Sequence, residues 1–110
     1  MRNNVMHLAS SPYAEALAWI TQHPASGSGV SLARLLLTLR RGGYSISECM
    51  LGLDPTRLDL ALRVIHHFTS HGGANEELIA AERHLEASEP SLVAVIQSAA
   101  AAREALKLKS

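Results

Sequence analysis

Helix-start and helix-stop signals divide this chain into short segments and constrain its fold more than any other feature. Ser11-Pro12 and Asp54-Pro55 each place a capping side chain before proline, the residue favoured at the first helical position. The pairs Gly42-Gly43 and Gly72-Gly73 are typical helix ends, because glycine readily adopts the backbone that closes a helix. We therefore expect a succession of short helices joined by tight connections.

Apolar residues recur at helical spacing inside these segments, and no segment has a convincing partner strand. We expect a compact all-α bundle of about five substantial helices plus one short helix, without a sheet. The short helix falls within residues 44–53 and is capped by Ser45 or Ser47. Residues 1–10 are expected to be an N-terminal tail, and residues 11–108 a single helical domain.

The helical spacing also predicts which side of each helix is buried. In "VSLARLLLTLRR" the buried stripe is expected at Leu32, Leu35, Leu36 and Leu39, with Arg34, Thr38 and Arg41 on the other side. In residues 55–70 it is expected at Leu58, Ala61, Leu62, Ile65 and Phe68, with Leu60 and Val64 on one edge. In the last helix it is expected at Leu92, Ile96, Ala99 and Leu106. The stretch "HPASGSG", which lies before "VSLARLLLTLRR", is expected to be a flexible connection.

Composition excludes several classes of function. Ten basic and ten acidic residues give a formal net charge of zero, which argues against a protein whose main work is neutralising phosphates. Cys49 is the single cysteine, so neither a disulfide framework nor a cysteine-rich zinc site is expected. No apolar run suits a signal peptide or a bilayer span, and we expect a cytoplasmic protein without membrane contact. No motif for a cofactor is present.

Three of the six histidines fall within "VIHHFTSHGG", the stretch most suggestive of chemistry. On a helix, His67 and His71 share a face at the i, i+4 spacing that can bind a metal, while His66 points elsewhere. His84 is a further candidate ligand from the next helix. Two imidazoles do not complete a zinc site, so we expect no physiological metal. A metal-dependent enzyme or sensor at His67 and His71 stays open as an alternative.

A second alternative is a helix-turn-helix DNA-binding regulator formed by residues 45–67, with Gly52 near the turn. Arg57 and Arg63 would lie on its recognition helix, but Asp59 beside them would repel phosphates. Glu48 stands where the motif expects a small buried residue. Sequence-specific DNA binding is therefore the weaker interpretation, although nucleic acid is not excluded as a partner.

We expect a small non-enzymatic accessory or protein–protein interaction module, with no catalytic residues and no cofactor. Its interaction surface is expected to combine a basic face and an acidic face with the alanine-rich last helix, at Arg34, Arg41, Arg57, Arg63, Glu76, Glu77 and Ala99. Small side chains in the last helix would let a second copy approach closely, and a two-fold dimer is the commonest assembly. The expected partners are an unidentified protein and a second copy of the chain.

The stretch "SGSGVSLARLLLTLRRGGYSISECMLGLDPTRLDLALRVIHHF" resembles a family of short uncharacterised bacterial proteins, often encoded on plasmids and integrated elements. The matching positions are Ser26 to Leu39, Gly42, Leu53, Asp54 and Leu60 to Ile65. Where the family usually has an Asn-Gly turn and a nearby aromatic residue, this chain has Gly42-Gly43-Tyr44. The resemblance implies a small accessory protein and brings no catalytic residue with it.

Overall fold

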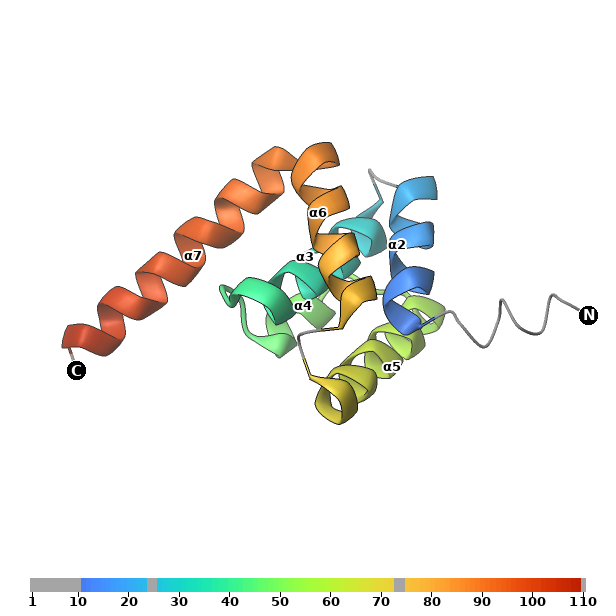
Figure 1. Cartoon of the computed structure of the whole chain (residues 1–110), viewed down its shortest axis with the longest axis horizontal. Coiled ribbons are helices and arrows are strands. Elements are labelled where there is room, and N and C mark those ends of the chain that lie inside the picture. The colour runs from blue at the N-terminus through green and yellow to red at the C-terminus, as the bar shows by residue number, and fades with distance from the viewer. Residues whose placement is uncertain (1–10, 24–25, 73–74, 110) are drawn as a thin grey trace, which may run out of the picture.

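The computed structural model describes residues 11–23, 26–72 and 75–109, and these form helices only. The helices are α2 (Pro12–Gln22), α3 (Gly27–Arg41), α4 (Ile46–Met50), α5 (Pro55–His71), α6 (Glu76–Ser88) and α7 (Pro90–Lys109). The all-α class is confirmed, with five longer helices and one short one in the described residues (Figure 1). The tail expected at residues 1–10 lies outside the described residues.

Local signals place the helix ends where the sequence predicts them. Ser11 and Asp54 cap α2 and α5, and their side chains accept hydrogen bonds from the backbone N–H groups of Ala14 and Arg57. Ser45 caps α4 by accepting a bond from the Glu48 N–H, and the Glu48 carboxylate accepts one from the Ser45 N–H, which completes a capping box. Asn75 likewise caps α6. Each cap satisfies backbone donors that the first helical turn leaves unpaired.

Helix α3 is the centre of the fold, because α2, α4, α5, α6 and α7 all pack against it. The expectation of one buried stripe on α3 is wrong for Thr38, which is buried, and Leu37 is buried as well. Three consecutive leucines make α3 apolar around most of its circumference, and such a helix is surrounded by others. Cys49 of α4 lies in this core, with its Sγ 3.7 Å from the Thr38 Oγ1.

Residues 26–29, at the end of the serine–glycine stretch, are not a flexible connection, because they form the cap and first turn of α3. Ser26 caps α3 by accepting a 2.9 Å bond from the Gly29 N–H, so the helix begins at Gly27. A Cβ on Gly29 would lie only 2.3 Å from the carbonyl oxygen of His23, at the end of α2. The glycine therefore lets two backbone segments approach closely.

The start of α3 also holds the junction between α4 and α5. The Ser28 Oγ lies 3.2 Å from the Asp54 Oδ2 and 3.4 Å from the Gly52 carbonyl oxygen. The Ser31 hydroxyl donates a 2.6 Å bond to the Leu51 carbonyl. The small residues that lead into α3 and the segment before α5 are thus in direct contact.

The buried side of α5 differs from the expected one. Leu60, Ala61 and Val64 are buried, whereas Leu58 is 38% exposed and Leu62 is 53% exposed. Apolar residues occupy both sides of this helix, so their spacing alone does not select the inner side. Contacts with α2 select it, because His67 packs edge-on against the Tyr13 ring with centroids 5.1 Å apart.

Helix α7 packs against α3 and α6 through its first half and then projects from the body (Figure 1). Val93 and Ile96 are buried, and Leu92 and Ala99 are half-buried. The expected stripe is wrong at Leu106, which is 65% exposed. The stripe therefore packs on the chain's own core as far as the middle of α7, and the side with Ala94, Ala101 and Ala105 is open to water.

Candidate functional site

The histidines at the end of α5 form a ring stack. The His67 and His71 rings lie nearly parallel, with centroids 4.1 Å apart and an angle of 19° between their planes. The His71 Nδ1 is also 3.1 Å from the His67 carbonyl oxygen. Burial, and then the charge of His71, lower the pKa of His67, and Glu77 partly offsets this. Neutral imidazoles suit such a stack, because two protonated rings would repel each other.

His66 and His84 do not join this pair. His66 is exposed and lies beside His67 at a surface hollow, and His84 is exposed on α6. Across residues 11–23, 26–72 and 75–109, no three His, Cys, Asp or Glu side chains are arranged to hold a metal ion. His67, His71 and His84 therefore do not form a common ligand set in the described structure.

Two of the candidate arginines lie over aromatic rings. The Arg34 guanidinium is 4.9 Å from the centre of the Tyr44 ring, and that of Arg57 is 4.6 Å from the Trp19 ring. The Arg57 Nε is also 3.5 Å from an oxygen of Asp54. These cation–π contacts hold the flat sides of the guanidinium groups against the protein surface.

The other two candidate arginines are paired with carboxylates from distant helices. Arg63 binds Glu15 of α2 with two nitrogens, at 2.8 Å and 3.0 Å, and Asp59 at 3.1 Å. Arg41 binds Glu82 at 2.6 Å and also pairs with Glu86. The hydrogen bonds of Arg63 lower the pKa of Glu15.

The expected separate basic and acidic faces are therefore partly joined within the chain. Arg40 and Arg41 at the end of α3 meet Glu82 on α6, whose pKa burial would raise. Hydrogen bonds from both arginines outweigh that effect and lower the Glu82 pKa. Glu76 and Glu77 lie apart from these pairs in the first turn of α6, with Glu76 exposed and Glu77 half-buried.

Residues 45–67 differ in several ways from a helix-turn-helix DNA-binding motif. Its first helix would be α4, which spans only five residues, Ile46–Met50. Glu48 is exposed and pairs with Arg103 of α7 at 2.9 Å. On α5, the arginines that would face phosphates are Arg57 and Arg63, which already have the partners described above. The outward side of this helix carries leucines instead.

An apolar row on the outer side of α5 is the feature that the sequence did not reveal. The α5 outer row consists of the exposed Leu58, Leu62 and Thr69, with Ile65 between them half-buried against the core. Residues three or four apart are neighbours on a helix surface. Leu62 lies at the edge of a hollow of about 310 Å³, lined also by Pro12, Asp59, Arg63, His66 and His67. Adjoining exposed aliphatic side chains with polar groups around them match the apolar centre and polar rim of a protein contact surface.

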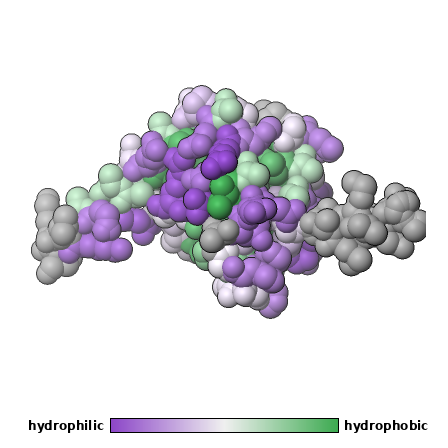
Figure 2. Space-filling view, viewed as in Figure 1, coloured by the Kyte–Doolittle hydropathy of each residue, from purple (hydrophilic) through white to green (hydrophobic). Residues whose placement is uncertain are grey.

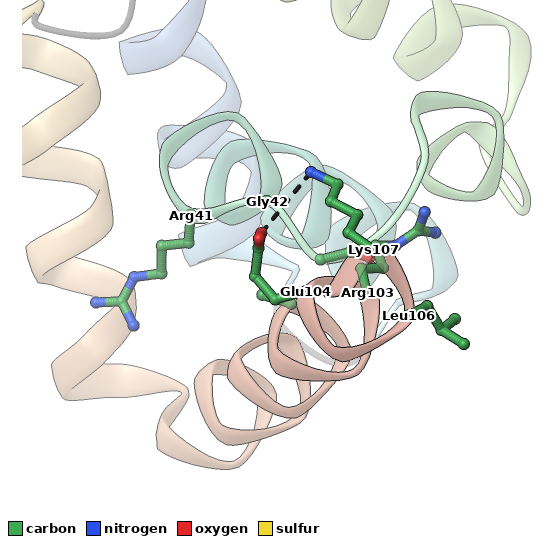
Figure 3. Close-up of a pocket in the computed structure, with 8 residues that line it drawn as sticks. Arg41, Gly42, Arg103, Glu104, Leu106 and Lys107 are labelled. Carbon is green, nitrogen blue, oxygen red and sulfur yellow. Dashed lines mark hydrogen bonds and ion pairs between the residues drawn. The ribbon is translucent and has the colours of Figure 1, made fainter. Parts of the chain in front are cut away.

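A larger hollow of about 480 Å³ lies between the end of α3 and the last turns of α7. Gly42 and Gly43 line it, and so does Arg103, which donates to the Gly43 carbonyl and to Glu48. In Figure 3 Glu104 and Lys107, one turn apart on α7, pair with each other, with the Lys107 Nζ 3.8 Å from the Glu104 Oε2. The Arg103 bonds fasten α7 to the body, and the lining offers no catalytic arrangement.

The face in Figure 2 carries hydrophilic side chains over much of its centre, with hydrophobic patches beside them. Cys49, the single cysteine, is fully buried, and burial raises the pKa of its thiol. None of the helices in the described ranges is long and apolar enough to cross a membrane.

Comparison with known proteins finds no relative. No family model, no curated protein and no solved structure matches this chain. The resemblance noted from residues 26–65 therefore stays a prediction.

Proposed function

We propose that this chain is a helical protein–protein interaction module that acts by surface contact, with the α5 outer row as its binding face. The observation that carries the proposal is the exposure of Leu62, 53% open to solvent in line with Leu58. Exposed leucines in a row cost solvation free energy unless a partner covers them. The proposal places the module in the cytoplasm, in agreement with its single free thiol at Cys49.

The surroundings of Leu62 support binding of a protein rather than of a nucleic acid. Arg63 and His66 border the row, but Glu15 and Asp59 already pair with Arg63. A phosphate backbone would meet a partly neutralised surface there. An apolar partner face would instead cover Leu58 and Leu62 and leave the polar groups at the rim, the usual anatomy of a protein interface.

Affinity capture from the native host tests this proposal. The full chain, Leu62→Glu and the control Ser70→Glu are immobilised at equal amounts, because Ser70 is an exposed position of α5 outside the row. We expect the wild type and Ser70→Glu to retain the same host protein. Leu62→Glu should retain at least tenfold less of it. Equal retention by all three would show that the row is not the binding face.

The expected homodimer belongs to the same proposal, but Ala99 cannot be the residue at its interface that is tested. Ala99 is half-buried against the chain's own body, so Ala99→Glu would disturb the fold as well as any dimer. Ala101 is exposed, so a substitution such as Ala101→Glu tests self-association without disturbing the fold.

A further inference from the structure

The start of helix α2 is held beside the hollow that contains Leu62. This α2–α5 hollow, of about 310 Å³, is lined by Pro12, Asp59, Leu62, Arg63, His66 and His67. Its member Pro12 is the first residue of α2. Glu15 pairs with Arg63, and the Tyr13 ring packs edge-on against His67, so this end of α2 is fixed on α5. The chain that leads into α2 therefore joins the body at the rim of the hollow.

Residues 1–10 are long enough and apolar enough to cover this hollow. Their sequence, MRNNVMHLAS, has three apolar residues within four positions, Val5, Met6 and Leu8. An extended chain spans about 3.3 Å per residue, so Leu8 reaches about 10 Å from the cap of α2 and Met6 about 17 Å. Because α2 starts at the rim of the hollow, either side chain reaches Leu62.

The charges beside the hollow favour a basic segment. Glu15 and Asp59 share the guanidinium of Arg63, and these three groups sum to one negative charge. The preceding arginine of α5 pairs with the carboxylate that caps this helix, so it does not offset that charge. Residues 1–10 contain one arginine, Arg2, and no acidic residue. The segment and the surface beside its attachment point are therefore complementary in charge.

The larger hollow beside α7 does not offer the same complement. Its lining carries three basic side chains and one acidic side chain. It also lies beside the last turns of α7, on the side of the molecule away from α2 (Figure 1). A segment with an arginine and no carboxylate is repelled there. Attachment point and charge thus both select the α2–α5 hollow.

We propose that residues 5–8 of the chain's own N-terminal segment pack into the α2–α5 hollow and cover Leu62, with Arg2 near Asp59. This inference rests on the proposed function, because Leu62 belongs to the α5 outer row and a protein partner of that row has to displace the segment. Packing of apolar side chains on Leu62 removes apolar surface from water. The contact is intramolecular, and a short tether gives an effective concentration of about a millimolar, so a weak contact suffices.

Thiol labelling of the full chain tests the contact without a partner. His66→Cys places a thiol in the lining of the hollow, and Ser98→Cys places a control thiol at an exposed position of α7. The native thiol of Cys49 is fully buried and does not interfere. Each variant carries either the native segment or the paired substitutions Met6→Ser and Leu8→Ser. The rate of reaction with a water-soluble maleimide is then measured.

The native segment should protect the thiol in the hollow. The His66→Cys thiol should react at least fivefold more slowly with the native segment than with the two serines, which corresponds to a hollow occupied about four-fifths of the time. The Ser98→Cys thiol should react at the same rate with both segments. Leu62→Ser should relieve the protection from the other side of the contact, and Arg2→Glu should relieve part of it by repelling Asp59. Circular dichroism should show the same helix content in every variant.

Three results of the labelling would overturn the inference. Equal rates for the His66→Cys thiol with both segments would show that residues 5–8 do not cover the hollow. Protection that appears only as the protein concentration is raised would assign the cover to a second copy. Protection that Arg2→Glu leaves unchanged would remove the pairing with Asp59.

Affinity capture separates this inference from the proposed function. The chain with Met6→Ser and Leu8→Ser should retain at least threefold more of the host protein that Leu62→Glu loses, and an equal amount would show that the segment does not compete. Protection of the hollow without host protein retained through Leu62 would refute the proposed function and leave the contact standing. Retention through Leu62 without protection would refute the contact alone.

Discussion

Gly29 is the position where one added methyl group should have the largest measurable effect. In an ordinary helix, Gly→Ala stabilises by about 0.5–1 kcal/mol, because alanine loses less conformational entropy on folding. At Gly29 the new Cβ would lie 2.3 Å from the His23 carbonyl oxygen, whereas real Cβ contacts stay beyond 3.0 Å. The end of α2 and the start of α3 would have to separate by about 0.7 Å.

Overpacking of this kind costs about 1–3 kcal/mol. The obstacle at Gly29 is backbone, which cannot rotate away as a flexible side chain can, so we take the upper part of that range. After the helix-propensity gain, Gly29→Ala should lower the free energy of unfolding by about 1–2 kcal/mol. For a chain of this size, the midpoint of thermal unfolding should fall by about 4–10 °C.

Urea unfolding followed by circular dichroism measures this effect, and Gly27→Ala is the matched control. A Cβ on Gly27 meets only the Gly52 carbonyl oxygen, at an ordinary 3.8 Å. Gly27→Ala should therefore be neutral or stabilising by up to about 1 kcal/mol. If Gly29→Ala proves as stable as Gly27→Ala, then α2 and α3 do not approach each other as described.

Three further predictions concern stability. Leu60→Ala should lower the free energy of unfolding by about 2–5 kcal/mol, and Leu62→Ala, at an exposed position, by less than about 1 kcal/mol. Equal urea midpoints for the two variants would refute the orientation of α5. Because the folded pKa of His67 lies below the usual 6.5, the unfolded chain binds the proton more readily, so stability should fall as the pH drops below about 6.5. His67→Gln should reduce that fall between pH 7.5 and 5.5, and an unchanged pH profile would exclude the ring stack as its source. Glu82→Gln should cost about 1–3 kcal/mol at pH 7 in a thermal melt, while a cost below that of Glu86→Gln would contradict the double pairing with Arg40 and Arg41.

The helix boundaries could be predicted because their signals are local. Caps such as Asp54 and Asn75 act on backbone groups two or three residues away, so the sequence contains both partners of each interaction. The serine–glycine stretch is ambiguous in the sequence, because glycine and serine are also common in flexible connections. Its specific signal was the recurrence of small residues at Gly27, Ser28 and Ser31, which share one side of a helix.

The orientation of α5 and the partners of the arginines could not be predicted, because both depend on contacts between distant segments. Leu58 and Leu60 are equally apolar, and only the packing of α2 decides which one is buried. Arg63 meets Glu15 across 48 residues, and Arg41 meets Glu82 across 41. A helical wheel shows only neighbours on one helix, so it could not reveal that Arg41 and Arg63, expected on an open basic face, are paired with carboxylates of other helices.

Site-specific photo-crosslinking tests the central claim, that this chain acts through the outer side of α5. A photoreactive residue replaces Leu62 in one version of the full chain and Ser70 in a control, and each is expressed in the native host and irradiated. The account predicts a discrete crosslinked band from position 62 that is absent from position 70, and a band at twice 11.8 kDa would identify a second copy. The same pattern of bands from both positions, or none from position 62, would contradict the account.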